Sequence, residues 1–161
     1  GATLGLIGSG TLGNGVARLA EAFGMRVMHA ERKGAAVVRP GYTAFADLLP
    51  EADAISLHCP LTAETLNLIG EPELRAMKRS ALLINTARGG IVDEAALIRA
   101  LKEGWIAGAG FDVITAEPPP AEPKPEKVPA LGKKEQAQAD ALTAHVGTDW
   151  ADLLPGPATP Q

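Results

Sequence analysis

The segment Leu83–Asp93 places an arginine directly after an apolar run and directly before two glycines. The guanidinium of Arg88 is a permanent planar cation whose N–H groups bind carboxylates in a bidentate manner. Gly89 and Gly90 allow a ligand to come close to the backbone. An arginine at the tip of a buried strand therefore predicts a binding position for an anionic substrate.

A glycine-rich turn, Gly8-Ser-Gly10-Thr-Leu-Gly13, lies upstream of this arginine. The first glycine permits a tight turn, the second lets a pyrophosphate approach the backbone, and the third lets helix and strand pack closely. The amides of Thr11 and Leu12 would open a helix and offer hydrogen bonds to an anion. Such a turn alone also occurs in unrelated α/β proteins. A strand before it, a helix after it and an acid further on favour dinucleotide binding.

That acid is Glu31, which lies 31 − 10 = 21 residues beyond Gly10, close to the roughly 20 expected of a ribose-binding carboxylate. It would accept hydrogen bonds from the ribose hydroxyls and repel a 2′-phosphate, so NAD is the predicted coenzyme. Arg32 and Lys33 follow directly, and an arginine there can bind the 2′-phosphate of NADP, which leaves NADP as an alternative. All three residues could instead form a solvated turn.

Strand and helix patterns alternate over the first part of the chain. The short, nearly continuous apolar runs predict strands over Thr3–Ile7, Arg26–Ala30, Ala54–Leu57, Ala81–Asn85 and Ile106–Phe111. The stretches between them predict helices over Leu12–Phe23, Thr43–Leu49, Glu71–Met77 and Glu94–Glu103. Asp93 suits a helix N-cap, and Gly24 and Gly104 suit helix C-termini. The alternation predicts an α/β fold: a right-handed, doubly wound parallel sheet of the Rossmann type.

Proline usage divides the chain, since nine of its 13 prolines lie from Pro118 onward. We expect residues 1–117 to form the dinucleotide-binding domain and 118–141 to form a proline-rich linker with a weak helix. A short last strand over Ala141–Val146 and a frayed tail would complete the same domain over 142–161. The chain starts at Gly1 and enters a strand at once, so we expect an excised domain or a chain lacking upstream sequence.

Composition narrows the class of protein. The length of 161 residues suits one domain, and 46% hydrophobic residues indicate a globular chain. A net charge of −4 without a basic stripe gives no reason to expect nucleic acid. No apolar run reaches the roughly 18 residues of a membrane span. One cysteine, Cys59, suits a reducing compartment, so we expect a cytoplasmic protein without membrane contact. We expect no metal site.

Five segments in this order resemble the D-isomer-specific 2-hydroxyacid dehydrogenases, most closely the hydroxypyruvate reductase (glycerate dehydrogenase) branch. They are Gly5-Leu-Ile-Gly-Ser-Gly10, Ala22-Phe-Gly-Met-Arg-Val27, Asp53-Ala-Ile-Ser-Leu-His-Cys-Pro-Leu-Thr62, Asn85-Thr-Ala-Arg-Gly-Gly-Ile-Val-Asp-Glu94, and Gly110-Phe-Asp-Val113 with Glu117-Pro-Pro119. The resemblance covers about Gly1–Pro120. It implies a nucleotide-binding Rossmann domain without its substrate domain.

By this resemblance Arg88, Glu117 and His145 are the catalytic residues. Reduction of a 2-oxo acid needs a cation for the carboxylate and a proton donor titrating near neutrality, for which histidine is suited. A carboxylate beside that imidazole would raise its pKa and orient it. The alternatives are a surface ion pair for Arg88, a linker cap for Glu117 and an exposed tail residue for His145. The family usually has proline before this histidine, where this chain has Ala144.

The resemblance also assigns residues along the coenzyme. Asp112 would contact the nicotinamide carboxamide, and Thr86 and Ala87 would lie along the nicotinamide ribose. Cys59, Pro60 and Thr65 would line the adenosine and pyrophosphate side. A small buried apolar role for Cys59 and a solvated strand end for Asp112 stay open.

The expected activity is reversible NADH-dependent reduction of a small 2-oxo acid, such as hydroxypyruvate or glyoxylate, to the D-2-hydroxy acid. A homodimer is implied by the resemblance alone. Because half of the substrate cleft is missing, we expect the isolated chain to bind coenzyme and to be weakly active or inactive. The alternative is a non-catalytic dinucleotide-binding or interaction module derived from the same family. An unrelated α/β domain with a chance glycine turn is a third reading.

Overall fold

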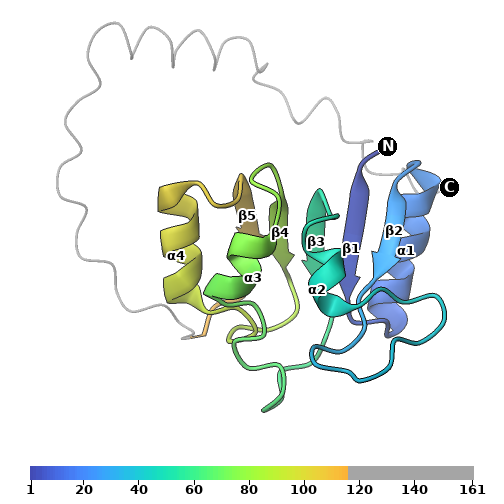
Figure 1. Cartoon of the computed structure of the whole chain (residues 1–161), viewed down its shortest axis with the longest axis horizontal. Helices are drawn as coiled ribbons and strands as arrows, with labels where there is room; N and C mark the ends of the chain where they lie inside the picture. The colour runs from blue at the N-terminus through green and yellow to red at the C-terminus, as the bar shows by residue number, and fades with distance from the viewer. Residues whose placement is uncertain (116–161) are drawn as a thin grey trace, which may run out of the picture. The chain divides into compact units, whose positions relative to one another are not determined.

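The computed structural model describes residues 1–115, which form one parallel sheet flanked by helices (Figure 1). The five strands are β1 (Thr3–Ile7), β2 (Arg26–His29), β3 (Ala54–Leu57), β4 (Leu82–Asn85) and β5 (Gly108–Phe111). Their order across the sheet is β2-β1-β3-β4-β5, and all four pairings are parallel. The predicted parallel α/β sheet is confirmed.

The carboxyl ends of the strands meet at one edge of the sheet. Ile7 pairs in register with Leu57, Leu57 with Asn85, and Asn85 with Phe111. The loops that follow these residues therefore lie side by side, although they come from four distant parts of the sequence. In open α/β sheets ligands bind at this edge, where neighbouring strands send their chains to opposite faces. Here that point lies between β1 and β3.

The helices cover both faces of the sheet. They are α1 (Thr11–Ala22), α2 (Phe45–Leu48), α3 (Glu71–Ala76) and α4 (Glu94–Glu103). Ala17 and Ala20 of α1 pack on Leu4 and Leu6 of β1 at one face. The other three helices lie on the opposite face, with α3 against α4 (Figure 1). This two-sided arrangement is the doubly wound architecture that the strand and helix alternation predicts.

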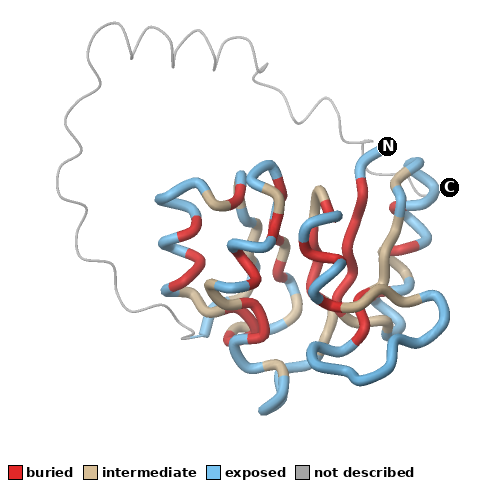
Figure 2. Tube along the Cα trace, in the orientation of Figure 1, coloured by how far each residue is buried: buried red, intermediate tan, exposed pale blue. Residues whose placement is uncertain are grey.

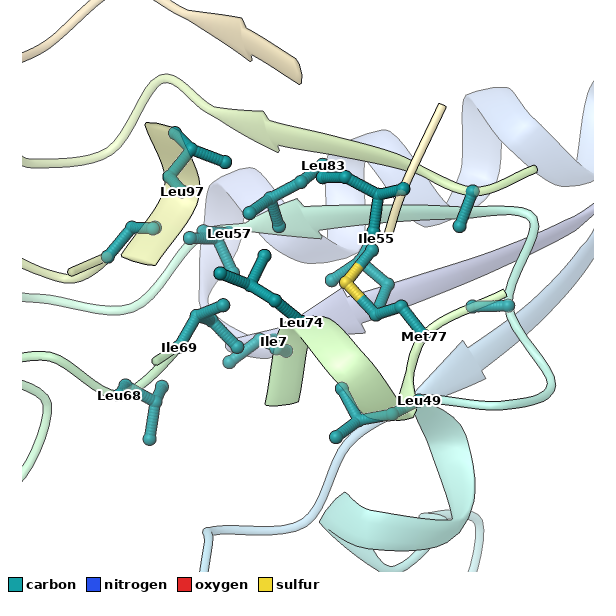
Figure 3. Close-up of a cluster of buried hydrophobic side chains, with 14 of the residues drawn as sticks. Ile7, Leu49, Ile55, Leu57, Leu68, Ile69, Leu74, Met77, Leu83 and Leu97 are labelled. Carbon is teal, nitrogen blue, oxygen red and sulfur yellow. The ribbon is translucent and has the colours of Figure 1, made fainter. Parts of the chain in front are cut away.

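The larger core lies between the sheet and helices α2, α3 and α4. Figure 3 shows its centre, where Ile55, Leu57 and Leu83 of the strands contact Leu74 of α3. These four side chains are fully buried, and full burial of a Leu or Ile side chain stabilises by about 1.5–3 kcal/mol. Figure 2 shows buried residues running along β1 and β3, whereas the loop over residues 32–41 is exposed. Arg32, Lys33 and Arg39 of this exposed loop line a pocket at the carboxyl edge of the sheet.

Helix α4 has the caps that the sequence predicts. Asp93 Oδ1 accepts a hydrogen bond from the Ala96 amide at 3.1 Å, and Gly104 ends the helix with a φ of +67°. Glycine carries no Cβ, so it adopts this left-handed conformation without strain. Together these caps fix where the chain enters and leaves α4.

The predicted element bounds are wrong by one to two residues at several ends. The helix expected over Thr43–Leu49 is the shorter α2, because Thr43 instead forms an isolated parallel bridge with Ala30 at the edge of β2. The Thr43 amide donates to the His29 carbonyl at 2.8 Å. The strand expected over Ile106–Phe111 begins at Gly108, while Ile106 packs into the core. β4 ends at Asn85, so Arg88 lies in the turn after the strand rather than at its tip.

No helix within residues 1–115 is long and apolar enough to cross a membrane. Within the same residues no group of three or more His, Cys, Asp or Glu side chains could hold a metal ion. The predicted linker and the strand over Ala141–Val146 lie outside the described residues, as do Glu117 and His145.

Candidate functional site

The glycine-rich turn connects β1 to α1, and its glycines serve different purposes. Gly8 has a φ of +106°, and a Cβ there would lie 2.6 Å from the carbonyl carbon of His58. A Cβ on Gly13 would collide with the Gly8 carbonyl oxygen. No atom lies within 4 Å of a Cβ built on Gly10. Gly8 and Gly13 are therefore required by packing, whereas Gly10 faces open space.

The amino end of α1 is open to an anion. Gly10 is the N-cap residue, no side chain caps the helix, and its first turn contains no acidic residue. The amides of Thr11, Leu12 and Gly13 belong to the first turn, where backbone N–H groups have no partner inside a helix. Such amides bind phosphate groups together with the positive end of the helix dipole. The arrangement fits the pyrophosphate of a dinucleotide.

A pocket of about 410 Å³ extends from this turn along the carboxyl edge of the sheet. It is lined by parts of the loops that follow β1, β2 and β3. Seven of its lining residues are among those predicted to bind coenzyme: Gly8, Gly10, Glu31, Arg32, Cys59, Pro60 and Thr65. The structure thus brings together residues that are up to 57 positions apart in the sequence, from Gly8 to Thr65.

Glu31 lies at one end of the pocket and is 5% exposed. Its carboxylate accepts hydrogen bonds from Arg39 Nε at 2.6 Å and Arg39 Nη2 at 2.9 Å. The backbone amide of Arg32 donates to the same carboxylate at 2.9 Å. The bonds with Arg39 above all lower the pKa of Glu31 to about 2. The predicted ribose acid is therefore ionised and already paired.

Tyr42 connects this acid to the glycine-rich turn. Its hydroxyl donates to Ser9 Oγ at 2.7 Å, and the Arg39 guanidinium lies 3.9 Å from the centre of its ring. Sequence reasoning missed Ser9, Arg39 and Tyr42. Arg39 lies eight residues after Glu31, and Tyr42 lies 33 residues after Ser9, so no local spacing pattern indicates these contacts.

The loop after β3 forms the opposite wall of the pocket. The Thr65 hydroxyl donates to the Pro60 carbonyl at 2.6 Å and accepts from the Thr62 amide at 2.7 Å, which closes a turn. Burial raises the pKa of the Cys59 thiol, so the thiol stays protonated near neutrality. Burial lowers the pKa of His58, whose Nε2 is hydrogen-bonded to Ser56 Oγ at 2.9 Å. At His58 and Cys59 this wall is therefore uncharged near neutrality, and Glu64 adds an acidic group to the same wall.

The turn after β4 presents Arg88. Asn85, which is 1% exposed, accepts the Ala87 amide at 3.1 Å and donates from Nδ2 to the Arg88 carbonyl at 2.9 Å. The Arg88 side chain is exposed, and its Nη1 donates to the Ala87 carbonyl at 2.7 Å. Asn85 was not predicted as a site residue, although a polar residue closing an apolar run is a signal for such a turn.

The segment after β5 returns to this turn. The Asp112 amide donates to the Asn85 carbonyl at 3.1 Å. A Cβ on Gly89 would collide with the Ile114 carbonyl, so glycine is required there for the two segments to meet. Thr115 Oγ1 donates to Glu94 at 2.7 Å. Thr86, Ala87, Arg88 and Asp112 thus gather at the edge of β4 and β5, and they do not line the 410 Å³ pocket.

Comparison with known proteins identifies the family. Residues 1–147 match the model of the D-isomer specific 2-hydroxyacid dehydrogenase NAD binding domain. The chain is 53% identical to the glycerate dehydrogenase of Methylorubrum extorquens over 119 residues, which are 74% of this chain and 37% of that protein. The chain therefore spans little more than a third of the length of this relative.

Two solved structures show the same fold. One is the NAD complexed form of the D-isomer specific 2-hydroxyacid dehydrogenase from Lactobacillus delbrueckii ssp. bulgaricus (TM-score 0.64, 45% identity, 71% of this chain and 36% of that one). The other is an NADPH-dependent glyoxylate/hydroxypyruvate reductase from Sinorhizobium meliloti (TM-score 0.66, 37% identity, 76% of this chain and 39% of that one). The chain belongs to the D-isomer-specific 2-hydroxyacid dehydrogenases, of which it is the NAD-binding domain.

Proposed function

We propose that this domain serves an enzyme that reduces a small 2-oxo acid with NADH and releases the D-2-hydroxy acid. The observation that carries the proposal is the pocket at the β1–β3 switch point, where Gly10 faces open space beside an uncapped helix. The name of the glycerate dehydrogenase relative and that of the glyoxylate/hydroxypyruvate reductase support hydroxypyruvate or glyoxylate as substrate.

Different residues of the pocket would bind different parts of the coenzyme. The amides between Gly8 and Gly13 would hold the pyrophosphate, and Glu31 would face the adenosine ribose. Cys59, Pro60 and Thr65 would line the adenosine side. When bound, NADH supplies the hydride. The largely neutral, partly buried wall at His58 and Cys59 would help to keep water away from the bound coenzyme.

The β4–β5 edge would hold the reacting end. Thr86 and Ala87 would lie along the nicotinamide ribose, and Asp112 would accept from the carboxamide. Arg88 would bind the substrate carboxylate through its fork of N–H groups. Its exposed guanidinium lies on a turn whose backbone is hydrogen-bonded by the Asn85 side chain. Glu117 and His145, outside the described residues, would form the proton-donating pair.

Substitution of Arg88 tests the proposal. Arg88→Ala should leave NADH binding intact, as measured by the change in coenzyme fluorescence. The residual NADH-dependent reduction of hydroxypyruvate should fall by about 10²–10³-fold, the range seen when one charge-stabilising donor is removed. Arg99→Ala is a matched control, because Arg99 pairs with Glu71 at 2.8 Å on the outer side of α4 and α3. An unchanged rate in Arg88→Ala would instead favour a non-catalytic dinucleotide-binding module.

We also propose a cellular compartment and an oligomeric state for the protein. We place it in the cytoplasm, a reducing compartment that suits a chain with one cysteine, and propose a homodimer by analogy with the family. Sedimentation of the purified chain at several concentrations tests the second point, and a single monomer boundary at all of them would contradict it.

A further inference from the structure

The carboxylate of Glu31 has its hydrogen-bonding capacity filled before any ligand arrives. Oε2 accepts from the Arg39 Nε at 2.6 Å and from the Arg39 amide at 3.2 Å. Oε1 accepts from Arg39 Nη2 and from the Arg32 amide, both at 2.9 Å. A bidentate guanidinium pair of this kind is strong and geometrically specific. The formal charge of the predicted ribose acid is therefore cancelled within its own loop.

Arg39 is held in this position from a second side. Its guanidinium stacks on the ring of Tyr42, and the Tyr42 hydroxyl is anchored on Ser9 of the glycine-rich turn. The Arg39 side chain is nevertheless 53% exposed, and the residue lines the pocket. A ribose 2′-oxygen that comes within hydrogen-bond distance of Glu31 thus lies next to an accessible cation.

The remaining charges at this end of the pocket add to the effect. Lys33 pairs with Glu73 at 2.8 Å, so these two charges cancel. The exposed guanidinium of Arg32 has no hydrogen-bond or ion-pair partner among residues 1–115. With Glu31 and Arg39 neutral as a pair, the local balance is one positive charge. The acidic Glu64 lies on the opposite wall, in the loop after β3.

An unpaired carboxylate at this position selects NAD because it accepts the ribose hydroxyls and repels a 2′-phosphate. Once it is paired with arginine, the repulsion is lost and two guanidinium groups stand beside the 2′-position. We propose that Arg39 sets the coenzyme selectivity, so that the pocket accepts the 2′-phosphate of NADP as well as the free ribose of NAD. The inference rests on the proposed coenzyme pocket and names a residue that determines its specificity.

Titration of the 161-residue chain with NADH and with NADPH tests the inference. The two dissociation constants of the unsubstituted chain should agree within about tenfold. In Arg39→Gln, the ratio of the constants should shift toward NADH by about ten- to hundredfold, the effect of one charge-assisted hydrogen-bonding group. The pair 5′-AMP and 2′,5′-ADP should show the same shift, which assigns it to the adenosine end.

Arg26→Gln is the matched control. Arg26 also pairs with a glutamate, Glu51, at 2.9 Å. However, Arg26 lies at the amino end of β2, whereas the pocket lies at the carboxyl ends of the strands. Arg26→Gln should leave the ratio of the NADH and NADPH dissociation constants unchanged. Glu31→Gln should release Arg39 and strengthen NADPH binding, so the two substitutions in the pair move the selectivity ratio in opposite directions. Thermal unfolding of each variant verifies that it is folded.

Three outcomes count against the inference. NADPH binding more than a hundredfold weaker than NADH binding in the unsubstituted chain overturns it. So does a ratio in Arg39→Gln that stays within twofold of the original. Both results leave the coenzyme pocket itself in place. Absence of binding by NADH and NADPH alike rejects the proposed function and this inference together.

Discussion

The side-chain amide of Asn85 holds the carbonyl of Arg88 at 2.9 Å, so the last residue of a buried strand shapes the turn that carries the exposed cation. The Oδ1 atom of the same side chain accepts the Ala87 amide at 3.1 Å. Two polar groups of one buried side chain thus satisfy two backbone groups that could not pair within the sheet. These two bonds fix the backbone of the turn, and a fixed backbone can hold a guanidinium in position.

Asn85→Ala should therefore damage both stability and the site. Loss of two hydrogen bonds at a buried position should lower the free energy of unfolding by about 2–4 kcal/mol, because backbone groups are left unsatisfied. Urea unfolding measures the change. Asn85→Asp keeps the acceptor for Ala87 but buries a charge and sets an anionic oxygen against the Arg88 carbonyl oxygen, so its cost should be at least as large. Equal stabilities of all three proteins would show that the turn forms without this side chain.

The glycine-rich turn allows packing and binding to be separated. Gly10→Ala should leave the free energy of unfolding unchanged or raise it by up to about 1 kcal/mol, since the position is unstrained and an alanine reduces the freedom of the unfolded chain. Its affinity for NADH should nevertheless fall at least tenfold, because the methyl group occupies the space that the pyrophosphate needs. Calorimetric titration and urea unfolding measure the two quantities.

Two other glycines provide the controls. Gly13→Ala should destabilise the fold by about 1–3 kcal/mol, because its Cβ meets the Gly8 carbonyl. Gly15 lies inside α1 with open space around it, so Gly15→Ala should stabilise by up to about 1 kcal/mol and leave binding unaltered. Loss of NADH affinity in Gly15→Ala to the same degree as in Gly10→Ala would disprove the division of roles.

The strands could be predicted because their signal is local. Short apolar runs separated by helical patterns identify β1 to β5 to within two residues. The parallel direction of the strands follows from the helices that connect them. The glycine-rich turn was found for the same reason, since Gly8, Gly10 and Gly13 act over a span of six residues.

The pairing of Glu31 could not be predicted, because it depends on how the loop over residues 32–43 folds back on the sheet. Most of that loop is exposed, and its path is determined by the bridge between Ala30 and Thr43 and by the Tyr42 contact with Ser9. A spacing rule predicts Glu31 as the ribose acid, and Glu31 lines the pocket. The rule carried no information on Arg39, which reaches the acid only in the folded chain.

Two neighbouring leucines of β4 test which face of this strand is buried. Leu83→Ala should lower the free energy of unfolding by about 2–5 kcal/mol, because Leu83 is fully buried in the larger core. Leu82 is 45% exposed and points to the other face, so Leu82→Ala should cost less than about 1 kcal/mol. Urea unfolding measures the free energy of unfolding of both variants, which carry the same Leu→Ala change at adjacent positions. Similar costs at both positions would contradict the assignment of faces.

The pH dependence of stability should report Asp53, which joins the start of β1 to the end of α3. Its Oδ1 accepts from Lys78 at 2.8 Å and its Oδ2 from the Thr3 amide at 2.7 Å. These bonds, that of Lys78 above all, lower the pKa of Asp53 below its ordinary value of 3.8. The unfolded chain therefore binds this proton first. The stabilisation is complete above about pH 4 and is lost as the pH falls through the lower, folded pKa.

Asp53→Asn should accordingly lower stability at pH 7 and flatten its decline below pH 4, as measured by urea unfolding at a series of pH values. Asp47→Asn is the control, because Asp47 is exposed on α2 and should leave the slope of the acid limb as it is. Lys78→Met removes the partner and should shrink the same pH-dependent step while the carboxylate remains. An acid limb of equal steepness in Asp53→Asn and the unsubstituted chain would show that this carboxylate contributes nothing to the acid sensitivity of the fold.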